Sequence, residues 1–279
     1  MAKRGRISET FERLRGRGEA ALIPFIVAGD PDLEHTALLV KELASSGADL
    51  IELGIPFSDP MADGPANQRA LARGMAGGGT VAGVLGMVAA LRTELQTPII
   101  LFGYFNPFFH YGCARLCEDA ARAGVDGLLV VDMPPEESAA LKEPARRAGI
   151  DLIYLLAPTT PLARSHRIAR AATGFLYYVS VTGVTGARAQ VGADVEERVR
   201  ALKAITELPI GVGFGISTPE QAAQVATYAD AVVVGSALSL LIENCGPSPR
   251  LLPEVGGFVR RLKDAMLAAR KPAPAAHAE

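Results

Sequence analysis

Short apolar runs alternate with amphipathic segments along almost the whole chain. The clearest run is Ala21-Leu-Ile-Pro-Phe-Ile-Val-Ala28, and Gly29-Asp-Pro31 closes it. Because it is apolar at both odd and even positions, it is typical of a strand buried on both faces in a parallel sheet. Comparable runs predict seven further strands, at residues 49–53, 98–103, 127–132, 151–155, 175–180, 209–212 and 231–234.

A helical pattern precedes the first strand, and at least one follows every strand. Ile7, Phe11 and Leu14 fall at helical spacing among charged residues, which predicts a short amphipathic helix near the start of the chain. Thr80 is expected to cap one later helix, and Pro144 to kink or shorten another. The other helices are predicted at residues 33–46, 67–73, 81–95, 111–123, up to 148, 162–172, 195–205, 219–227, 236–243 and 255–269.

Eight strands, each followed by a helix, predict a protein of the α/β class. No change of composition marks a linker, so residues 1–269 are expected to form a single (β/α)8 TIM barrel. The helix before the first strand and the short helix 236–243 after the eighth are additions to that plan. A doubly wound open sheet is the alternative, but Gly29-Asp-Pro31 is not the glycine fingerprint expected there. The Pro/Ala-rich tail, residues 270–279, is expected to be disordered.

Composition and charge exclude several classes of protein. The 279 residues have a formal net charge of −2 and no long run of Lys or Arg, so a nucleic-acid partner is not expected. The basic start is followed by Glu9 and Glu12 rather than an apolar core, and no apolar stretch is long enough to span a membrane. The three cysteines form no CxxC pair, which favours reduced thiols in a cytoplasmic protein.

Two carboxylates lie close together in sequence at the end of the second predicted strand. Glu52 ends the apolar run, and Asp63 follows in a loop stiffened by Pro56, Pro60 and Pro65. Paired carboxylates on a rigid support suit general acid–base catalysis, because their surroundings can drive their pKa values apart. The alternative is structural: a buried Glu that hydrogen-bonds a loop, and an Asp that caps the next helix. The barrel favours function, since active sites lie at the C-terminal ends of barrel strands.

Two glycine loops occupy the usual phosphate position of such barrels. Gly213-Phe-Gly215 follows the seventh strand and Gly235-Ser236 follows the eighth, where backbone N–H groups and a helix N-terminus can bind an anion. The loop 180–190 after the sixth strand is either a mobile lid or an ordinary surface loop. Tyr177, within that strand, is expected to be a core residue unless it points into the barrel mouth.

Other catalytic devices have little support in the sequence. The four histidines form no ligand spacing with Cys, Asp or another His, so no metal site is expected. The strand runs contain no lysine, which disfavours an aldolase that works through a covalent imine.

Long motifs in the chain resemble the tryptophan synthase alpha chain family. The most specific is Glu52-Leu-Gly-Ile-Pro-Phe-Ser-Asp-Pro-Met-Ala-Asp-Gly-Pro65, and Pro24–Pro31, Gly183-Val-Thr-Gly186 and Gly213-Phe-Gly-Ile-Ser217 accompany it. The resemblance covers roughly residues 7–267. It implies a lyase that cleaves indole-3-glycerol phosphate to indole and glyceraldehyde 3-phosphate in a retro-aldol reaction without a cofactor.

The resemblance also assigns roles to individual residues. It makes Glu52 and Asp63 the catalytic pair, and Thr185 the lid residue that bonds Asp63 when the loop closes. Some family members have an arginine where this loop has Val181, so a role for that charge does not carry over. The remaining implied substrate contacts are Phe25, Phe102 and Tyr177 around the indole, and Gly186, Gly215, Gly235 and Ser236 at the phosphate.

A partner is implied as well. Family members pair with a beta chain that carries pyridoxal phosphate, in a complex of two alpha and two beta chains, and no cofactor is expected on this chain. The loops containing Asp59 and Pro134 and the loop 104–110 would face that partner. Rival hypotheses are a non-catalytic activating subunit, or another phosphate-binding barrel enzyme such as an isomerase or a flavin oxidoreductase.

Overall fold

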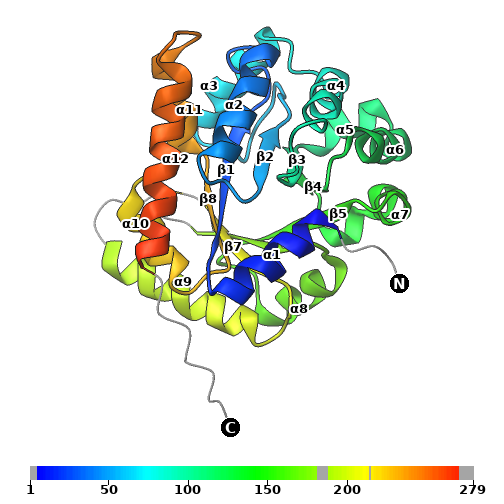
Figure 1. Ribbon diagram of the computed structural model, residues 1–279. Coiled ribbons are helices and arrows are strands. Elements are labelled where there is room, and N and C mark those ends of the chain that lie inside the picture. The colour runs from blue at the N-terminus through cyan, green and yellow to red at the C-terminus, as the bar shows by residue number, and fades with distance from the viewer. Residues whose placement is uncertain (1–4, 181–187, 214, 270–279) are drawn as a thin grey trace.

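A closed barrel of eight parallel strands forms the centre of the molecule. The computed structural model describes residues 5–180, 188–213 and 215–269, with the side chains of 188–193 left aside. Neighbouring strands follow chain order, and β8 pairs with β1 to close the barrel, which confirms the predicted fold. Figure 1 shows the strands surrounded by helices. The strands are β1 (Ala21–Val27), β2 (Ile51–Gly54), β3 (Ile99–Gly103), β4 (Gly127–Val130), β5 (Asp151–Leu156), β6 (Leu176–Val179), β7 (Ile210–Gly213) and β8 (Ala231–Val234).

The helices follow the predicted order apart from the additional helix α5, and the largest difference at an end is at α9, which begins at Arg188 rather than at 195, within the loop expected at 180–190. Both additions to the plain barrel are present, α1 before the first strand and α11 after the last. The side chain of Thr80 caps α4 by accepting a bond from the Gly83 N–H, as predicted. The α-helices are α1 (Arg6–Arg17), α2 (Leu33–Ser45), α3 (Pro65–Ala76), α4 (Val81–Leu91), α5 (Phe105–Tyr111), α6 (Cys113–Ala123), α7 (Ala139–Ala148), α8 (Leu162–Ala171), α9 (Arg188–Lys203), α10 (Pro219–Ala226), α11 (Ser236–Cys245) and α12 (Leu251–Ala268).

Most of the hydrophobic core forms two layers, and a small third cluster joins residues of β1 to residues of α3. The larger layer lies between the strands and the surrounding helices. The smaller one fills the barrel, where α1 contributes Ile7, Phe11 and Leu14 to a cluster with inward-facing strand residues such as Ile100 and Phe175. Figure 1 shows α1 in dark blue, lying across one end of the barrel. Apolar side chains therefore close one end of the barrel, and the active site is expected at the opposite end.

A paired charge cluster reinforces the closed end. Asp126, which lies directly before β4, accepts bonds from Arg6 Nε at 2.7 Å, from Arg92 Nη2 at 2.7 Å and from the Ile99 N–H at 2.8 Å. Both arginines also donate to the Gly124 carbonyl. Burial raises the pKa of Asp126, but the Ile99 N–H and the charges of Arg92 and Arg6 oppose that rise, so the role of this paired carboxylate is structural.

One local prediction was wrong. Residues 104–110 were expected to be a loop, but they contain α5, because Pro107 lies in the first turn, where no N–H is needed, and Phe108 is fully buried. The Phe105 N–H at the start of this helix also donates to Asp132 Oδ1 at 2.7 Å. Pro144 lies within α7, which continues to Ala148, so this proline does not end the helix, and the kink expected there stays a prediction.

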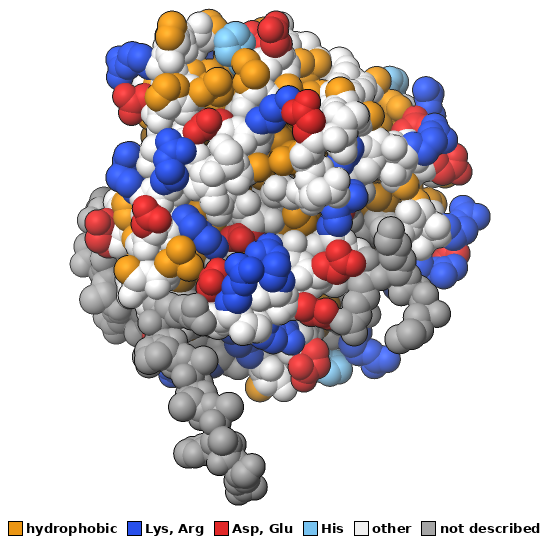
Figure 2. Space-filling model, viewed as in Figure 1, with side chains coloured by type: hydrophobic (Ala, Val, Ile, Leu, Met, Phe, Trp, Pro, Cys, Tyr) orange, Lys and Arg blue, Asp and Glu red, His pale blue; other side chains and the backbone are white. Residues whose placement is uncertain are grey.

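The surface agrees with the charge balance of the sequence. On the face shown in Figure 2, Lys and Arg side chains are interspersed with Asp and Glu. Among the described residues, no single helix is long and apolar enough to cross a membrane. One pair, α3 and α4, meets the length and composition criteria only when taken together, and the two helices meet at 87°. The cysteines Cys113, Cys117 and Cys245 are free thiols.

Candidate active site

A cavity of about 690 Å³ opens at the C-terminal ends of the strands, opposite α1. Glu52 and Asp63 both line it, together with aromatic residues from the barrel wall and the glycine loops after β7 and β8. Residues from all eight βα units therefore meet in one space, as expected for the active end of a (β/α)8 barrel.

Glu52 is a buried carboxyl without a compensating partner. It lies on β2, in register with Phe25 of β1, and its exposed fraction is 0%. Within the described part of the chain, neither carboxylate oxygen has a hydrogen-bond partner. Burial alone raises the pKa of Glu52 to about 8. The group is consequently a neutral acid at neutral pH, and it makes no hydrogen bond to a loop within the described residues.

Asp63 has the opposite surroundings. Its Oδ2 accepts from the Tyr104 hydroxyl at 2.7 Å, and its Oδ1 accepts from Asn67 Nδ2 at 3.3 Å. Burial raises its pKa above the ordinary value, and these two bonds oppose that rise. The residue does not cap α3, whose N-cap is Gly64 without a side-chain bond. Hydrogen-bond donors that favour the ionised form therefore contact Asp63, whereas among the described residues none contacts Glu52.

Aromatic side chains form the wall next to Glu52. Phe25 and Phe102 pack edge to face with ring centroids 5.0 Å apart, and both line the cavity. Tyr177 is 5% exposed and also lines the cavity, so it belongs to the mouth as well as to the core. Its hydroxyl lies where a side chain on Gly213 would have to be, only 2.0 Å from an ideal Cβ. Gly213 must therefore be a glycine for Tyr177 to hold this position.

The loops after β7 and β8 reach the same cavity. Gly215 has a positive φ of 76°, which favours glycine, and it lines the cavity with Gly235 and Ser236. Ser236 is the first residue of α11, whose ten residues include no Lys or Arg. An anion here would meet backbone N–H groups and the positive end of a helix dipole. Thr185, Gly186 and Val181 lie outside the described residues.

The two residues proposed to face a partner lie at the surface. Asp59, in the loop after β2, is exposed, and so is Pro134, in the loop after β4. Pro134 also lines the cavity at its outer edge. These two loops lie at the mouth of the barrel, so a partner that covered them would also cover the cavity.

Two residues of the site were missed from the sequence. Tyr104 directly follows β3, and this position at the C-terminal end of a strand was a usable signal. Asn67 was taken only as the first residue of a helix, since nothing in the local pattern shows that it faces Asp63. Among the described residues, no group of three or more His, Cys, Asp or Glu could hold a metal ion.

Fold and site together define a class. The molecule is a (β/α)8 barrel whose open end combines a neutral buried acid, a hydrogen-bonded second carboxylate, an aromatic wall and a helix N-terminus suited to an anion. This combination is typical of barrel enzymes that perform acid–base chemistry on phosphorylated substrates.

Comparison with known proteins identifies the family. The model of the tryptophan synthase alpha chain family matches residues 11–264. A tryptophan synthase alpha chain of Geobacter sp. (strain M21) is 55% identical over 262 residues, covering 94% of this chain and 98% of the relative. That of Gloeobacter violaceus is 50% identical over 266 residues, covering 95% and 96%.

Solved structures agree. Tryptophan synthase subunit alpha of Legionella pneumophila str. Paris superposes with a TM-score of 0.88 at 41% identity, covering 95% of this chain and 100% of that one. A chain of Mycobacterium tuberculosis tryptophan synthase gives 0.86 at 34% identity, with 97% and 100% covered. The chain belongs to the tryptophan synthase alpha chain family. It is a carbon–carbon lyase that cleaves indole-3-glycerol phosphate in tryptophan biosynthesis.

Proposed function

We propose that Glu52 and Asp63 carry out the cleavage as a retro-aldol reaction with general acid–base catalysis. The observation that supports this assignment most strongly is the contrast between the two carboxyls. Glu52 is buried without a partner and has a pKa of about 8, whereas Asp63 is held by two hydrogen bonds that favour its ionised form. One group can therefore donate a proton at neutral pH while the other remains an anion.

These two groups account for the proton transfers and the charge stabilisation that the cleavage requires. The neutral carboxyl of Glu52 protonates C3 of the indole, and the Asp63 carboxylate accepts a hydrogen bond from the ring N–H as positive charge develops on the ring. The resulting Glu52 carboxylate then takes the proton of the glycerol hydroxyl next to the ring. As the C–C bond breaks, its electron pair returns to the ring, which leaves indole, glyceraldehyde 3-phosphate and a neutral Glu52.

The rest of the cavity binds the two ends of the substrate. Phe25, Phe102 and Tyr177 provide an apolar, aromatic surface for the indole. Backbone N–H groups at Gly215, Gly235 and Ser236 receive the phosphate at the start of α11. The proposal extends to the loop after β6, where Gly186 would contact the phosphate and Thr185 would bond Asp63 in a closed state.

The proposal includes a partner. The chain is expected to pair with a tryptophan synthase beta chain in a cytoplasmic complex of two alpha and two beta chains, with Asp59 and Pro134 at the contact. Both residues are exposed, and Pro134 also lines the cavity, which supports this placement. Pyridoxal phosphate is expected on the beta chain and not on this one. A purified alpha chain that absorbs in the near-visible range would contradict that expectation.

Turnover of indole-3-glycerol phosphate tests the residue roles. Wild type, Glu52→Gln and Asp63→Asn are assayed alone and with a beta chain, and indole release is measured. Each substitution is expected to lower kcat by a factor of about 10² to 10⁴. Full activity in either variant would remove that residue from the catalytic pair. A wild type that stays inert even with a beta chain would favour the non-catalytic activator.

A further inference from the structure

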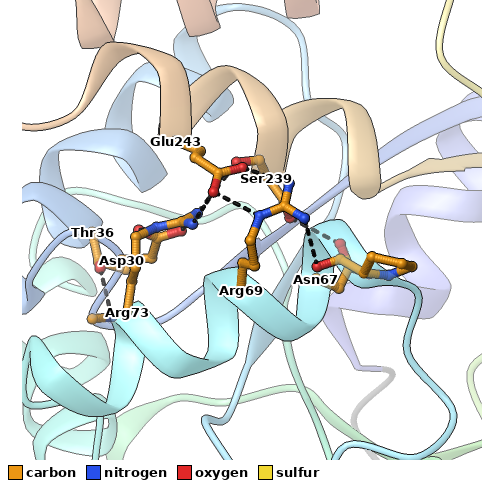
Figure 3. Close-up of polar contacts among 9 residues, drawn as sticks. Asp30, Thr36, Asn67, Arg69, Arg73, Ser239 and Glu243 are labelled. Atoms are coloured by element: carbon orange, nitrogen blue, oxygen red, sulfur yellow. Dashed lines mark hydrogen bonds and ion pairs between the residues drawn. The ribbon is translucent and has the colours of Figure 1, made fainter.

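A polar bridge leads from Asp63 to the helix at the proposed phosphate site. Asn67, in the first turn of α3, lies between them: its Nδ2 donates to Asp63 Oδ1 at 3.3 Å and its Oδ1 accepts from Ser239 Oγ at 2.9 Å. Figure 3 shows Asn67 on α3 beside Ser239 on the neighbouring α11. Asn67 and Asp63 both line the cavity.

The chemistry of the neighbours fixes the orientation of the Asn67 amide. An ionised carboxylate only accepts hydrogen bonds, so the NH₂ group must face Asp63. The carbonyl oxygen then faces Ser239, whose hydroxyl can donate. A flipped amide would put two acceptors against each other on the Asp63 side. The bridge therefore has one consistent direction, from the Ser239 hydroxyl through the amide to the carboxylate.

The bridge continues into the backbone of the phosphate-site helix. Ser239 is 1% exposed, and its N–H donates to the Gly235 carbonyl at 3.0 Å. Gly235 precedes Ser236, the first residue of α11. Three consecutive hydrogen bonds thus join the Asp63 carboxylate to the residue at which the phosphate is proposed to bind.

A second connection between α3 and α11 lies nearby but outside the cavity. Glu243 accepts from Arg69 Nε and Nη2 at 2.7 and 2.8 Å and pairs with Arg73 at 3.0 Å. Arg73 in turn holds the buried Asp30 through two bonds of 2.8 Å, as Figure 3 shows. Arg69 and Glu243 do not touch Asp63 in this network, so Arg69 provides a control for a purely structural link between the two helices.

We propose that Asn67 is a positioning residue, which aligns Asp63 with the indole and, through Ser239, sets the distance between that carboxylate and the phosphate-holding start of α11. The inference rests on the roles proposed above for Asp63 and the α11 N-terminus. As a consequence, side chains of α3 and α11 fix the distance between the site for the indole and the site for the phosphate of the same substrate. Asn67 also favours the anion at Asp63, because the amide N–H bonds only the ionised oxygen strongly.

The expected effects separate this role from a structural one. Asn67→Leu is expected to lower kcat about 10- to 100-fold, the range for loss of a hydrogen bond to a charged group, and to move the acid limb of the kcat/KM pH profile upward. Asn67→Asp keeps an acceptor for Ser239 but places a like charge beside Asp63, so it should move the acid limb further than Asn67→Leu. A structural role predicts the reverse order, since Asp is closer to Asn in shape.

A double-mutant cycle tests the link to α11. Ser239→Ala is expected to cause a smaller loss than Asn67→Leu in the same direction, and the double variant should be no worse than Asn67→Leu alone. Arg69→Met removes the exposed Arg69–Glu243 contact between the same helices and is expected to leave kcat and both pH limbs as in wild type. Thermal unfolding of all variants shows whether each one is folded.

The positioning role of Asn67 and its link to α11 are each overturned by a different result. An Asn67→Leu enzyme that folds and keeps the wild-type kcat and acid limb overturns the positioning role, and additive losses for Asn67 and Ser239 overturn the link to α11. Arg69→Met with the same acid-limb shift would reduce the effect to helix packing. Asp63→Asn is assayed in parallel: if it retains full activity, the proposed function fails, whereas an inactive Asp63→Asn beside a normal Asn67→Leu refutes this inference alone.

Discussion

Each end of the barrel contains a buried carboxyl, and the two carboxyls differ in their hydrogen-bond partners. At the closed end, Asp126 is 9% exposed and receives two arginines and a backbone N–H. At the open end, Glu52 is 0% exposed and, among the described residues, has no partner at either oxygen. Hydrogen bonds and opposite charges offset much of the cost of burying a carboxylate, whereas an unpaired one bears that cost and persists where its protonation is used. The presence or absence of partners, more than burial itself, distinguishes the structural acid from the functional one.

The largest expected effect is the pH dependence of stability at Glu52. Its pKa is raised from 4.5 to about 8 in the folded chain, so folding loses free energy as pH rises from about 4.5 to 8 and is unaffected below that window. Glu52→Gln removes this loss. The variant should therefore gain stability relative to wild type between pH 4.5 and 8, by up to about 5 kcal/mol at 1.36 kcal/mol per pH unit.

Urea unfolding of both proteins at several pH values checks this prediction, because the difference between them isolates Glu52. A difference that stays constant from pH 4.5 to 8 would show that the carboxyl ionises normally in the folded chain, and the contrast with Asp126 would disappear.

At the closed end the expected effect is on the fold alone. Asp126→Ala leaves Arg92 largely buried and Arg6 half-buried without their anion, and breaking a buried pair costs about 3–5 kcal/mol of unfolding free energy. Activity per folded molecule should not change, because this cluster is at the end opposite the cavity. Denaturant unfolding and kcat, normalised to the folded fraction, are measured together; a stable variant with reduced kcat would contradict the division of roles.

The pH profile of catalysis should show both acids of the open end. Protonated Glu52 is required, so kcat/KM should fall about tenfold per pH unit above roughly pH 8, where its carboxyl ionises. Ionised Asp63 is required as well, so kcat/KM should also fall on the acid side, at a pH above the ordinary range for Asp because burial raises its pKa. A profile without the basic limb would exclude neutral Glu52 as the proton donor.

The smallest of these effects concerns the partner of Asp63. Tyr104→Phe removes the hydroxyl that donates to Asp63 at 2.7 Å and accepts from the Ala62 N–H at 3.0 Å. Loss of a donor raises the pKa of the carboxyl, so the acid limb should move up and kcat should fall about tenfold. The basic limb, which belongs to Glu52, should stay in place; movement of both limbs would show a general distortion of the mouth.

The sequence was most informative where the chain is regular. Continuous apolar runs and the helix after each of them suffice to predict all eight strands, because a buried parallel strand has few alternatives. The helix α5 was missed since Asn106-Pro107 suggests a turn locally, and only the burial of Phe108 makes the helix favourable. The local sequence pattern cannot predict this burial, because it depends on contacts with residues distant in the chain.

The candidate site also contains residues that the sequence pattern predicts and residues that it does not. Glu52 and the two glycine loops were found because barrel geometry places strand ends together. The bonds from Tyr104 and Asn67 to Asp63 join residues 41 and 4 positions apart and depend on side-chain direction, which spacing alone does not give. The lack of a partner at Glu52 was likewise invisible, because a sequence shows the residue types present and not the contacts they make.

Titration of the Glu52 carboxyl in the folded chain is the most direct test of this contrast. The carboxyl signal, isolated by infrared or carbon-13 NMR difference between wild type and Glu52→Gln, is followed from pH 4 to 9. We predict that the protonated form persists through neutral pH and disappears near pH 8. A Glu52 carboxyl that is already ionised at pH 5 would contradict the central claim, because its ionised form would then be stabilised by partners as that of Asp126 is.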